Sequence, residues 1–112
     1  MPCTFWYNVC VMAKMTTIGE PEALQRLKTL SGWELDGASI RRKFTFGGFP
    51  DALAFVVRLG FDAEAVDHHP DILINYKRVT LTYTTHSEGG LTEKDFAGAA
   101  KASDLAAGMG GK

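Results

Sequence analysis

Helical periodicity marks two segments in the first 70 residues. Within 21–30, leucines recur every third residue after a proline, a residue type that suits the first helical turn. From Pro50 onward, apolar residues recur at intervals of three or four. This second helix should stop at His68 or His69, because the residue before a proline disfavours the helical conformation. Gly60 makes one unbroken helix less certain, because a glycine inside a helix is less favourable than alanine by about 1 kcal/mol.

Alternation of apolar and polar residues predicts four strands, paired as two hairpins. The segments 33–35 and 40–46 flank Asp36 and Gly37, a pair that favours a tight turn. The segments 72–76 and 79–85 flank a second turn. In the last strand, one face carries Val79, Leu81 and Tyr83, and the other carries Thr80, Thr82, Thr84 and, at the strand end, His86.

A third helix is expected over 92–107, followed by a glycine-rich tail that frays. Its inner face should carry Phe96, Ala99, Ala100 and Ser103. The order α-β-β-α-β-β-α predicts an α+β fold, in which three helices pack on one face of a four-stranded, mainly antiparallel sheet. We expect a single domain over 19–108, preceded by an N-terminal extension over 1–18 for which the pattern predicts no element.

Length and charge narrow the range of functions. The chain has 112 residues and a net charge of −1 at neutral pH. This length suits one domain whose core supplies modest stability, which favours a homo-oligomer. The balanced charge offers no basic surface for nucleic acid or anionic lipid, so neither is expected as a direct partner.

The first residues are apolar, but the stretch is too short to span a bilayer and lacks the basic start and cleavage site of a signal peptide. Met12 and Met15 are each candidates for an alternative start. Cys3 and Cys10 both lie in the first ten residues, so a cysteine pair can neither staple the domain nor supply a cysteine zinc cluster. A reducing compartment is therefore expected.

All three histidines fall in one short window of the chain. His68 lies at the predicted end of a helix, where the helix dipole and Asp67 favour a cationic imidazole, and Glu64 lies one turn earlier on the same face. Such an imidazole can donate a proton near neutral pH and take it back, as general acid and base catalysis requires. His69, held extended by Pro70, must point elsewhere. Two diverging imidazoles can contact two atoms of one substrate.

Each of these residues also has a structural interpretation. Histidine before proline is common at a helix end, and a lone histidine at a strand end, such as His86, is most often a surface residue. Asp95, three residues after Thr92, matches a capping box. Trp33 is either a core anchor or a stacking surface. Three imidazoles with nearby carboxylates also suit a metal site. The residue pattern leaves these alternatives open.

Five short motifs between residues 32 and 105 resemble one known family. They are GWEL at 32–35, KFTF at 43–46, EAVDHHPD at 64–71, NYKRVTLTYTTH at 75–86 and GLTEKDF at 90–96. Together they resemble the pterin-4a-carbinolamine dehydratase family, also known as the dimerization cofactor of a homeodomain transcription factor. The segment DILI at 71–74 departs from the family, in which a more aromatic stretch often stands.

The resemblance implies an enzyme that removes water from 4a-hydroxytetrahydropterin, such as 4a-hydroxytetrahydrobiopterin, to give quinonoid dihydropterin. Such a lyase acts in tetrahydrobiopterin recycling and needs no metal and no bound cofactor. The implied catalytic residues are His68, His69 and His86. The implied substrate-binding or supporting residues are Glu64, Asp67, Pro70, Asp95 and Trp33. Our hypothesis takes His69 as the principal acid and base, with the other two imidazoles holding the hydroxyl group and the pterin edge.

Two rival functions accompany this one. The resemblance also implies a protein-binding module, a dimerization cofactor or transcriptional coactivator, which would use an oligomer interface rather than the histidines. A metal-dependent hydrolase is the third alternative. The family resemblance further implies a homodimer or homotetramer located in the cytoplasm, with the nucleus as a second location and no membrane contact.

Overall fold

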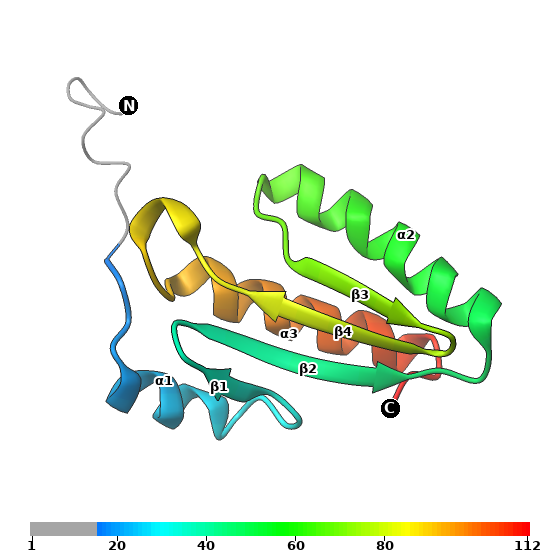
Figure 1. Ribbon diagram of the computed structural model, residues 1–112, viewed down its shortest axis with the longest axis horizontal. Helices are drawn as coiled ribbons and strands as arrows, with labels where there is room; N and C mark the ends of the chain where they lie inside the picture. The colour runs from blue at the N-terminus through cyan, green and yellow to red at the C-terminus, as the bar shows by residue number, and fades with distance from the viewer. Residues whose placement is uncertain (1–15) are drawn as a thin grey trace.

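The computed structural model describes residues 16–112, and the predicted order of elements is confirmed there (Figure 1). The elements are α1 (Glu20–Leu27), β1 (Glu34–Asp36), β2 (Ser39–Thr45), α2 (Phe49–Val66), β3 (Asp71–Asn75), β4 (Arg78–Tyr83), the short 3₁₀ helix η3 (His86–Glu88) and α3 (Glu93–Gly108). The expectations about Cys3, Cys10, Met12 and Met15 fall on residues outside the described part of the chain.

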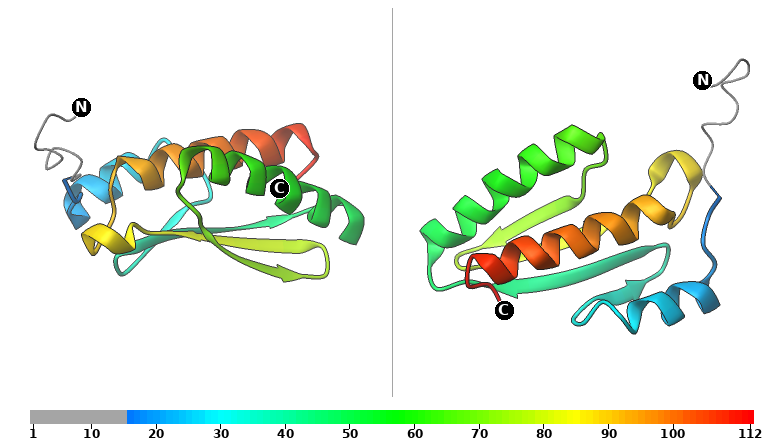
Figure 2. Two further views of the ribbon diagram at one scale, coloured as in Figure 1. Left: turned by 90° about the horizontal axis from the view of Figure 1, so that it is seen from above. Right: turned by 180° about the vertical axis from the view of Figure 1, so that it is seen from behind.

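The strands form one antiparallel sheet in the order β1-β2-β4-β3. Phe44 in β2 pairs with Val79 in β4, and Ile72 in β3 pairs with Leu81 in β4. The three helices lie on one face of this sheet, as expected (Figure 2). The sheet therefore has one face that packs against the helices and one face that they leave open.

The core lies between the sheet and the helices and contains several aromatic residues. Phe44, Phe46, Phe55 and Tyr83 are all buried, and the ring centroids of Phe46 and Phe55 lie 4.9 Å apart. On α3 the inner face is rotated from the expected one. Phe96 and Ala99 are buried as predicted, but Ala100 and Ser103 are only half-buried, and the other buried apolar residues are Ala102 and Ala106.

Helix α2 runs unbroken through Gly60 and ends at Val66, two or three residues before the predicted end. Asp67 stops it by adopting the left-handed conformation, with φ 53°. The N–H of His68 then donates to the carbonyl of Ala63 at 3.1 Å, a bond typical of helix ends closed by a left-handed residue. Because His68 lies beyond the helix, it leaves the face that Glu64 occupies.

The end of β4 corrects a prediction. The strand ends at Tyr83, and Thr85 forms only an isolated bridge with Gly90. His86 therefore does not lie on the polar face of a strand; it begins η3, where it is exposed. The alternation of buried and half-buried residues continues through Thr85, whose buried side chain bonds Thr92 and Asp95 at the start of α3, and the chain turns into η3 at the next residue.

The C-terminal tail does not fray. Gly110 has φ 81°, which lets the chain reverse after α3, and the N–H of Gly111 donates to the carbonyl of Ala106 at 2.8 Å. The N–H of Lys112 then donates to the carbonyl of Thr45 at the end of β2, also at 2.8 Å. The prediction failed because glycine content alone does not reveal these backbone bonds. Within residues 16–112, no helix has the length and apolarity that crossing a membrane requires.

Candidate active site

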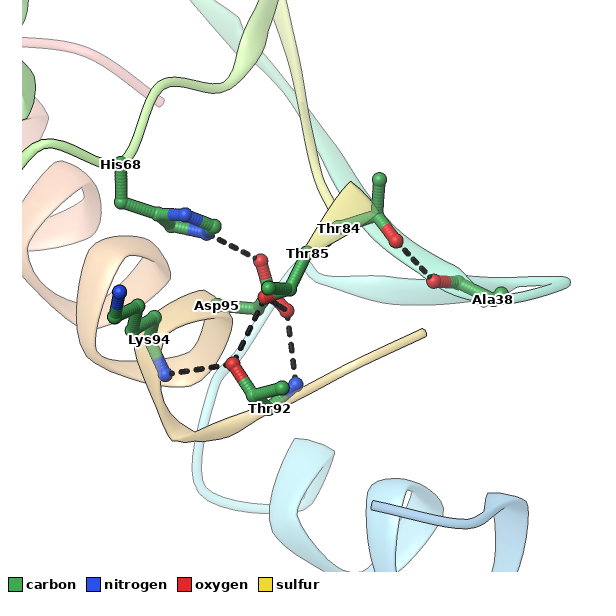
Figure 3. Close-up of polar contacts among 7 residues, drawn as sticks. All are labelled: Ala38, His68, Thr84, Thr85, Thr92, Lys94 and Asp95. Atoms are coloured by element: carbon green, nitrogen blue, oxygen red, sulfur yellow. Dashed lines mark hydrogen bonds and ion pairs between the residues drawn. The ribbon is translucent and has the colours of Figure 1, made fainter. Parts of the chain in front are cut away.

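A buried carboxylate, that of Asp95, organises the start of α3 (Figure 3). Its Oδ2 atom accepts a hydrogen bond from the N–H of Thr92 at 2.9 Å and another from the hydroxyl of Thr85 at 2.8 Å. The Thr92 hydroxyl accepts from the N–H of Lys94 at 3.3 Å. The predicted capping box is therefore confirmed.

The second oxygen of the same carboxylate holds an imidazole. Nε2 of His68 lies 2.7 Å from Oδ1 of Asp95, and the His68 side chain is only 11% exposed. The imidazole also stacks on the ring of Tyr83, with centroids 6.1 Å apart and planes inclined by 24°. The structural and functional interpretations of Asp95 are therefore compatible, because each uses a different oxygen.

His69 has a separate carboxylate partner. Its Nε2 lies 2.8 Å from Oε1 of Glu64, and both side chains are open to solvent, at 54% and 80% exposed. The spacing of four residues had indicated that Glu64 shares a helix face with His68. That expectation was wrong. The left-handed conformation of Asp67 turns His68 toward Asp95 on α3, and Glu64 bonds His69 instead.

These two pairs suit proton transfer. When Nε2 of an imidazole donates to a carboxylate, the tautomer is set and Nδ1 becomes the nitrogen that can exchange a proton with a ligand. An exposed ion pair contributes only about 0–1 kcal/mol to stability, so the fold has little need of the pair between His69 and Glu64. The pair between His68 and Asp95 is largely buried, whereas His69 is accessible.

The remaining predicted residues lie apart from these pairs. No hydrogen bond or ion pair links His86 to either of them within residues 16–112. Asp67 is exposed at the end of α2, and Pro70 is buried just before β3. Trp33 is a core residue, which favours the core-anchor interpretation: its ring packs 5.8 Å from that of Tyr83, and its Nε1–H donates to the Ser103 hydroxyl at 2.8 Å. The structure therefore joins two of the three imidazoles to carboxylates and leaves the third in η3.

Two residues next to His68 escaped the sequence analysis. The pattern placed Thr85 in a strand and Tyr83 on the apolar face of the same strand, but it did not indicate that Thr85 bonds Asp95 or that Tyr83 stacks on an imidazole. Burial, together with the nearby negative charges of Asp95 and Asp62, raises the pKa of Tyr83 to about 12. The glycine at position 98, inside a helix, was a usable signal, because it lies against the Tyr83 ring.

A cavity of about 320 Å³ lies beside His68, between α2 and α3. His69 and His86 do not line it. Within residues 16–112, no three side chains of the histidine, cysteine and acidic types lie close enough together to hold a metal ion.

The fold and the corner after α2, which carries His68 and His69, define a class of small α+β domains. In this class three helices cover one face of a four-stranded antiparallel sheet, and histidines follow the long helix. The family model described as Pterin 4 alpha carbinolamine dehydratase matches residues 16–105, and the chain belongs to this family.

Relatives in several organisms are similar along most of the chain. A protein of Roseiflexus sp. (strain RS-1) is 51% identical over 81 residues, which cover 72% of this chain and 87% of that one. A protein of Chloroflexus aurantiacus (strain ATCC 29366 / DSM 635 / J-10-fl) is 47% identical over 91 residues, which cover 81% and 98%. Both carry the name "Putative pterin-4-alpha-carbinolamine dehydratase".

Two solved structures are similar in fold. A transcriptional coactivator/pterin dehydratase from Brucella melitensis superposes with a TM-score of 0.77 at 39% identity, covering 81% of this chain and 99% of the other. A pterin dehydratase-like protein described as a RuBisCO assembly factor in the alpha-carboxysome gives a TM-score of 0.55 at 25% identity, covering 66% and 86%. The printed names of these similar proteins therefore include a dehydratase, a coactivator and an assembly factor.

Proposed function

We propose that this protein is a dehydratase that converts 4a-hydroxytetrahydropterin to quinonoid dihydropterin and water, as a step of tetrahydrobiopterin recycling. The observation that carries the proposal is the corner after α2, where two adjacent imidazoles each bond a carboxylate and diverge. The family and the names of the relatives support the substrate class.

The reaction needs one proton delivered and one removed. The C4a hydroxyl takes a proton, the C–O bond breaks and the oxygen leaves as water. The adjacent ring nitrogen loses a proton, and its electron pair forms the new double bond to C4a. In the proposed mechanism His69 supplies and removes these protons, because it is accessible and its partner Glu64 can stabilise the imidazolium. His68 and His86 hold and polarise the hydroxyl group and the pterin edge.

The direct test is a dehydration assay with a synthetic carbinolamine. We expect His69→Ala to lower kcat about 100-fold, at the lower end of general acid and base effects. The matched control is Asn75→Ala, an exposed position at the far end of β3 that should keep the wild-type rate. An unchanged rate in His69→Ala would remove this residue from its role. His86→Ala should raise KM more than it lowers kcat if that imidazole binds the pterin edge.

Two further measurements distinguish the proposed dehydratase from a metal-dependent hydrolase. The wild-type rate should change through the histidine titration range, between about pH 5 and 8. It should also survive a metal chelator, because the proposed steps need only imidazoles. A rate that required a stoichiometric metal would favour the hydrolase instead.

A protein-binding function is the second candidate. It is favoured by a stripe of exposed apolar side chains on α2, formed by Phe49, Leu53, Val57 and Phe61, because contiguous exposed apolar surface often marks an interaction site. The Brucella melitensis protein described as a coactivator points the same way. If this candidate is correct, histidine variants keep the biological effect and substitutions in the α2 stripe abolish it.

A further inference from the structure

The cavity between α2 and α3 has the size and lining of a small-molecule site. The two helices lie side by side over the sheet (Figure 2), and each faces the cavity with residues spaced three or four apart. Leu59, Ala63 and Val66 come from α2, whereas Ala97 and Gly98 come from α3. Its volume of about 320 Å³ lies at the lower end of the range found for ligand pockets. Small side chains on both helices leave this space open.

A buried phenol lines the same cavity. Tyr83 is 2% exposed, and its hydroxyl has no hydrogen-bond partner among residues 16–112. A buried hydroxyl without a partner is unfavourable, so this group is available to a ligand. Its pKa of about 12, raised by burial, keeps it a donor at neutral pH. Gly98 leaves the room for the ring, since a Cβ there would lie 2.6 Å from Cε1 of Tyr83.

Positive charge lines the cavity along α3. Lys94 and Lys101 are seven residues apart, which is two turns on one side of the helix, and both line the cavity. Neither forms an ion pair within the described residues. Asp62 stands on the α2 side, so the two ammonium groups exceed the single carboxylate. This balance favours an anionic group on the α3 side.

The cavity borders the proposed catalytic corner at His68 but does not include the pair between His69 and Glu64. Of the three histidines only His68 reaches it, and neither Glu64 nor His69 lines it. A pterin carries polar atoms around most of its ring, and the largely apolar lining would leave many of them without partners. We propose that this cavity binds a small carboxylic acid with an apolar body that bears a hydrogen-bond acceptor. The lysines bind the acid, and the Tyr83 hydroxyl donates to the acceptor.

Three probes test the two polar contacts separately in the full-length chain. 4-Phenylbutyrate offers the acid alone, 4-(4-acetylphenyl)butyrate adds a carbonyl acceptor, and 4-phenylbutan-1-ol lacks the charge. Binding is followed by backbone amide shifts in a nitrogen-15 NMR titration. We expect both acids to shift Ala97 and Gly98, and the alcohol to bind about 5-fold more weakly than 4-phenylbutyrate, the effect of one exposed ion pair.

Variants then assign each contact. Tyr83→Phe should weaken the acetyl probe about 10-fold and leave 4-phenylbutyrate unchanged, because only the acetyl group uses the hydroxyl. Lys101→Met should weaken both acids about 2- to 5-fold. Ala97→Leu should abolish binding by filling the cavity. Ala107→Leu, at an exposed position on the same helix outside the cavity, should bind like wild type.

Three results would overturn the proposal. The acids could fail to shift the amides around the cavity while the protein is folded. A dihydropterin could compete with the acetyl probe and shift the same amides, which would make the cavity the substrate site. Alternatively, Ala97→Leu could dissociate an oligomer in sedimentation, which would show that a second copy of the chain fills the space. The dehydration assay is independent of all three, so either proposal can fail alone.

Discussion

Asp95 both stabilises the start of α3 and holds an imidazole of the candidate site. Both oxygens of this buried carboxylate are used, one by the cap of α3 and Thr85, and the other by His68. Asparagine keeps the shape but offers a single acceptor oxygen, so either the cap or the imidazole loses its bond. We expect Asp95→Asn to lower the free energy of unfolding by about 1–3 kcal/mol, measured by urea denaturation.

The matched control for this change is Asp104→Asn, an exposed position on the same helix. It should alter stability by no more than about 0.5 kcal/mol. If Asp95→Asn unfolds at the same urea concentration as wild type, the hydrogen bonds of the buried carboxylate do not stabilise the fold.

Tyr83 makes stability depend on alkaline pH. Burial raises its pKa from 10.0 to about 12, so in this range the unfolded chain loses the phenolic proton before the folded protein does. The contribution to stability is complete below pH 10 and is lost as the pH rises toward 12. The slope approaches about 1.4 kcal/mol per pH unit.

Urea denaturation of wild type and Tyr83→Phe at several values between pH 9 and about pH 11.5 isolates this effect, because other titrating groups are common to both proteins. The difference in unfolding free energy should shift in favour of the phenylalanine variant as the pH rises. Parallel curves would show that the Tyr83 hydroxyl ionises equally easily in both states.

At the scale of elements, two glycines inside helices behave oppositely. Gly60 in α2 has open space around it, whereas a Cβ at Gly98 in α3 would lie 2.6 Å from the Tyr83 ring. Gly60→Ala should stabilise the protein by about 0.5–1 kcal/mol, because alanine is the better helix former. Gly98→Ala gains the same propensity but must displace the ring, so we expect a net loss of about 1–3 kcal/mol.

The two variants serve as controls for each other, since the change in chemistry is identical. Thermal and urea denaturation of both proteins compare them directly. If Gly98→Ala is as stable as Gly60→Ala, the Tyr83 ring is free to move, and the cavity lining is softer than the contact implies.

The elements were predictable because their signals are local. Periods of three to four and of two residues predicted every α-helix and strand in the described part of the chain, with ends correct to a few residues, but not the 3₁₀ helix η3. The errors occur where a distant group competes with the local pattern. The side chain of Thr85 bonds Thr92 and Asp95 after β4 has ended, so a run of alternating residues overstated the strand and misplaced His86.

The same distinction explains the candidate site. That Asp95 caps α3 could be predicted, because the cap spans three residues. That it also holds His68 could not, because the partners are 27 residues apart in sequence. Glu64 bonds His69 rather than His68 because Asp67 adopts a left-handed backbone conformation. A glycine at position 67 would have indicated such a conformation in the sequence, whereas an aspartate does so much less clearly.

At the scale of the whole molecule, the apolar stripe of α2 has no cover within the described chain. Its members recur every fourth residue, and Phe61, the most exposed, is 72% open to solvent. Burying such side chains against a second copy would contribute about 1.5–3 kcal/mol each, which a domain of this size can use. We therefore expect a homo-oligomer that contacts through this stripe.

Phe61→Glu tests this expectation by placing a charge in the stripe. Sedimentation velocity over a range of concentrations should show wild-type dimers or tetramers, and the variant should need at least about 10-fold more protein to assemble, because desolvating an unpaired carboxylate is unfavourable. Gln25→Glu, an exposed change on α1, adds the same charge elsewhere and should assemble like wild type. A wild-type protein that sediments as a monomer at high concentration would leave the stripe without a homotypic partner. Equal weakening by both variants would point to net charge rather than to the α2 surface.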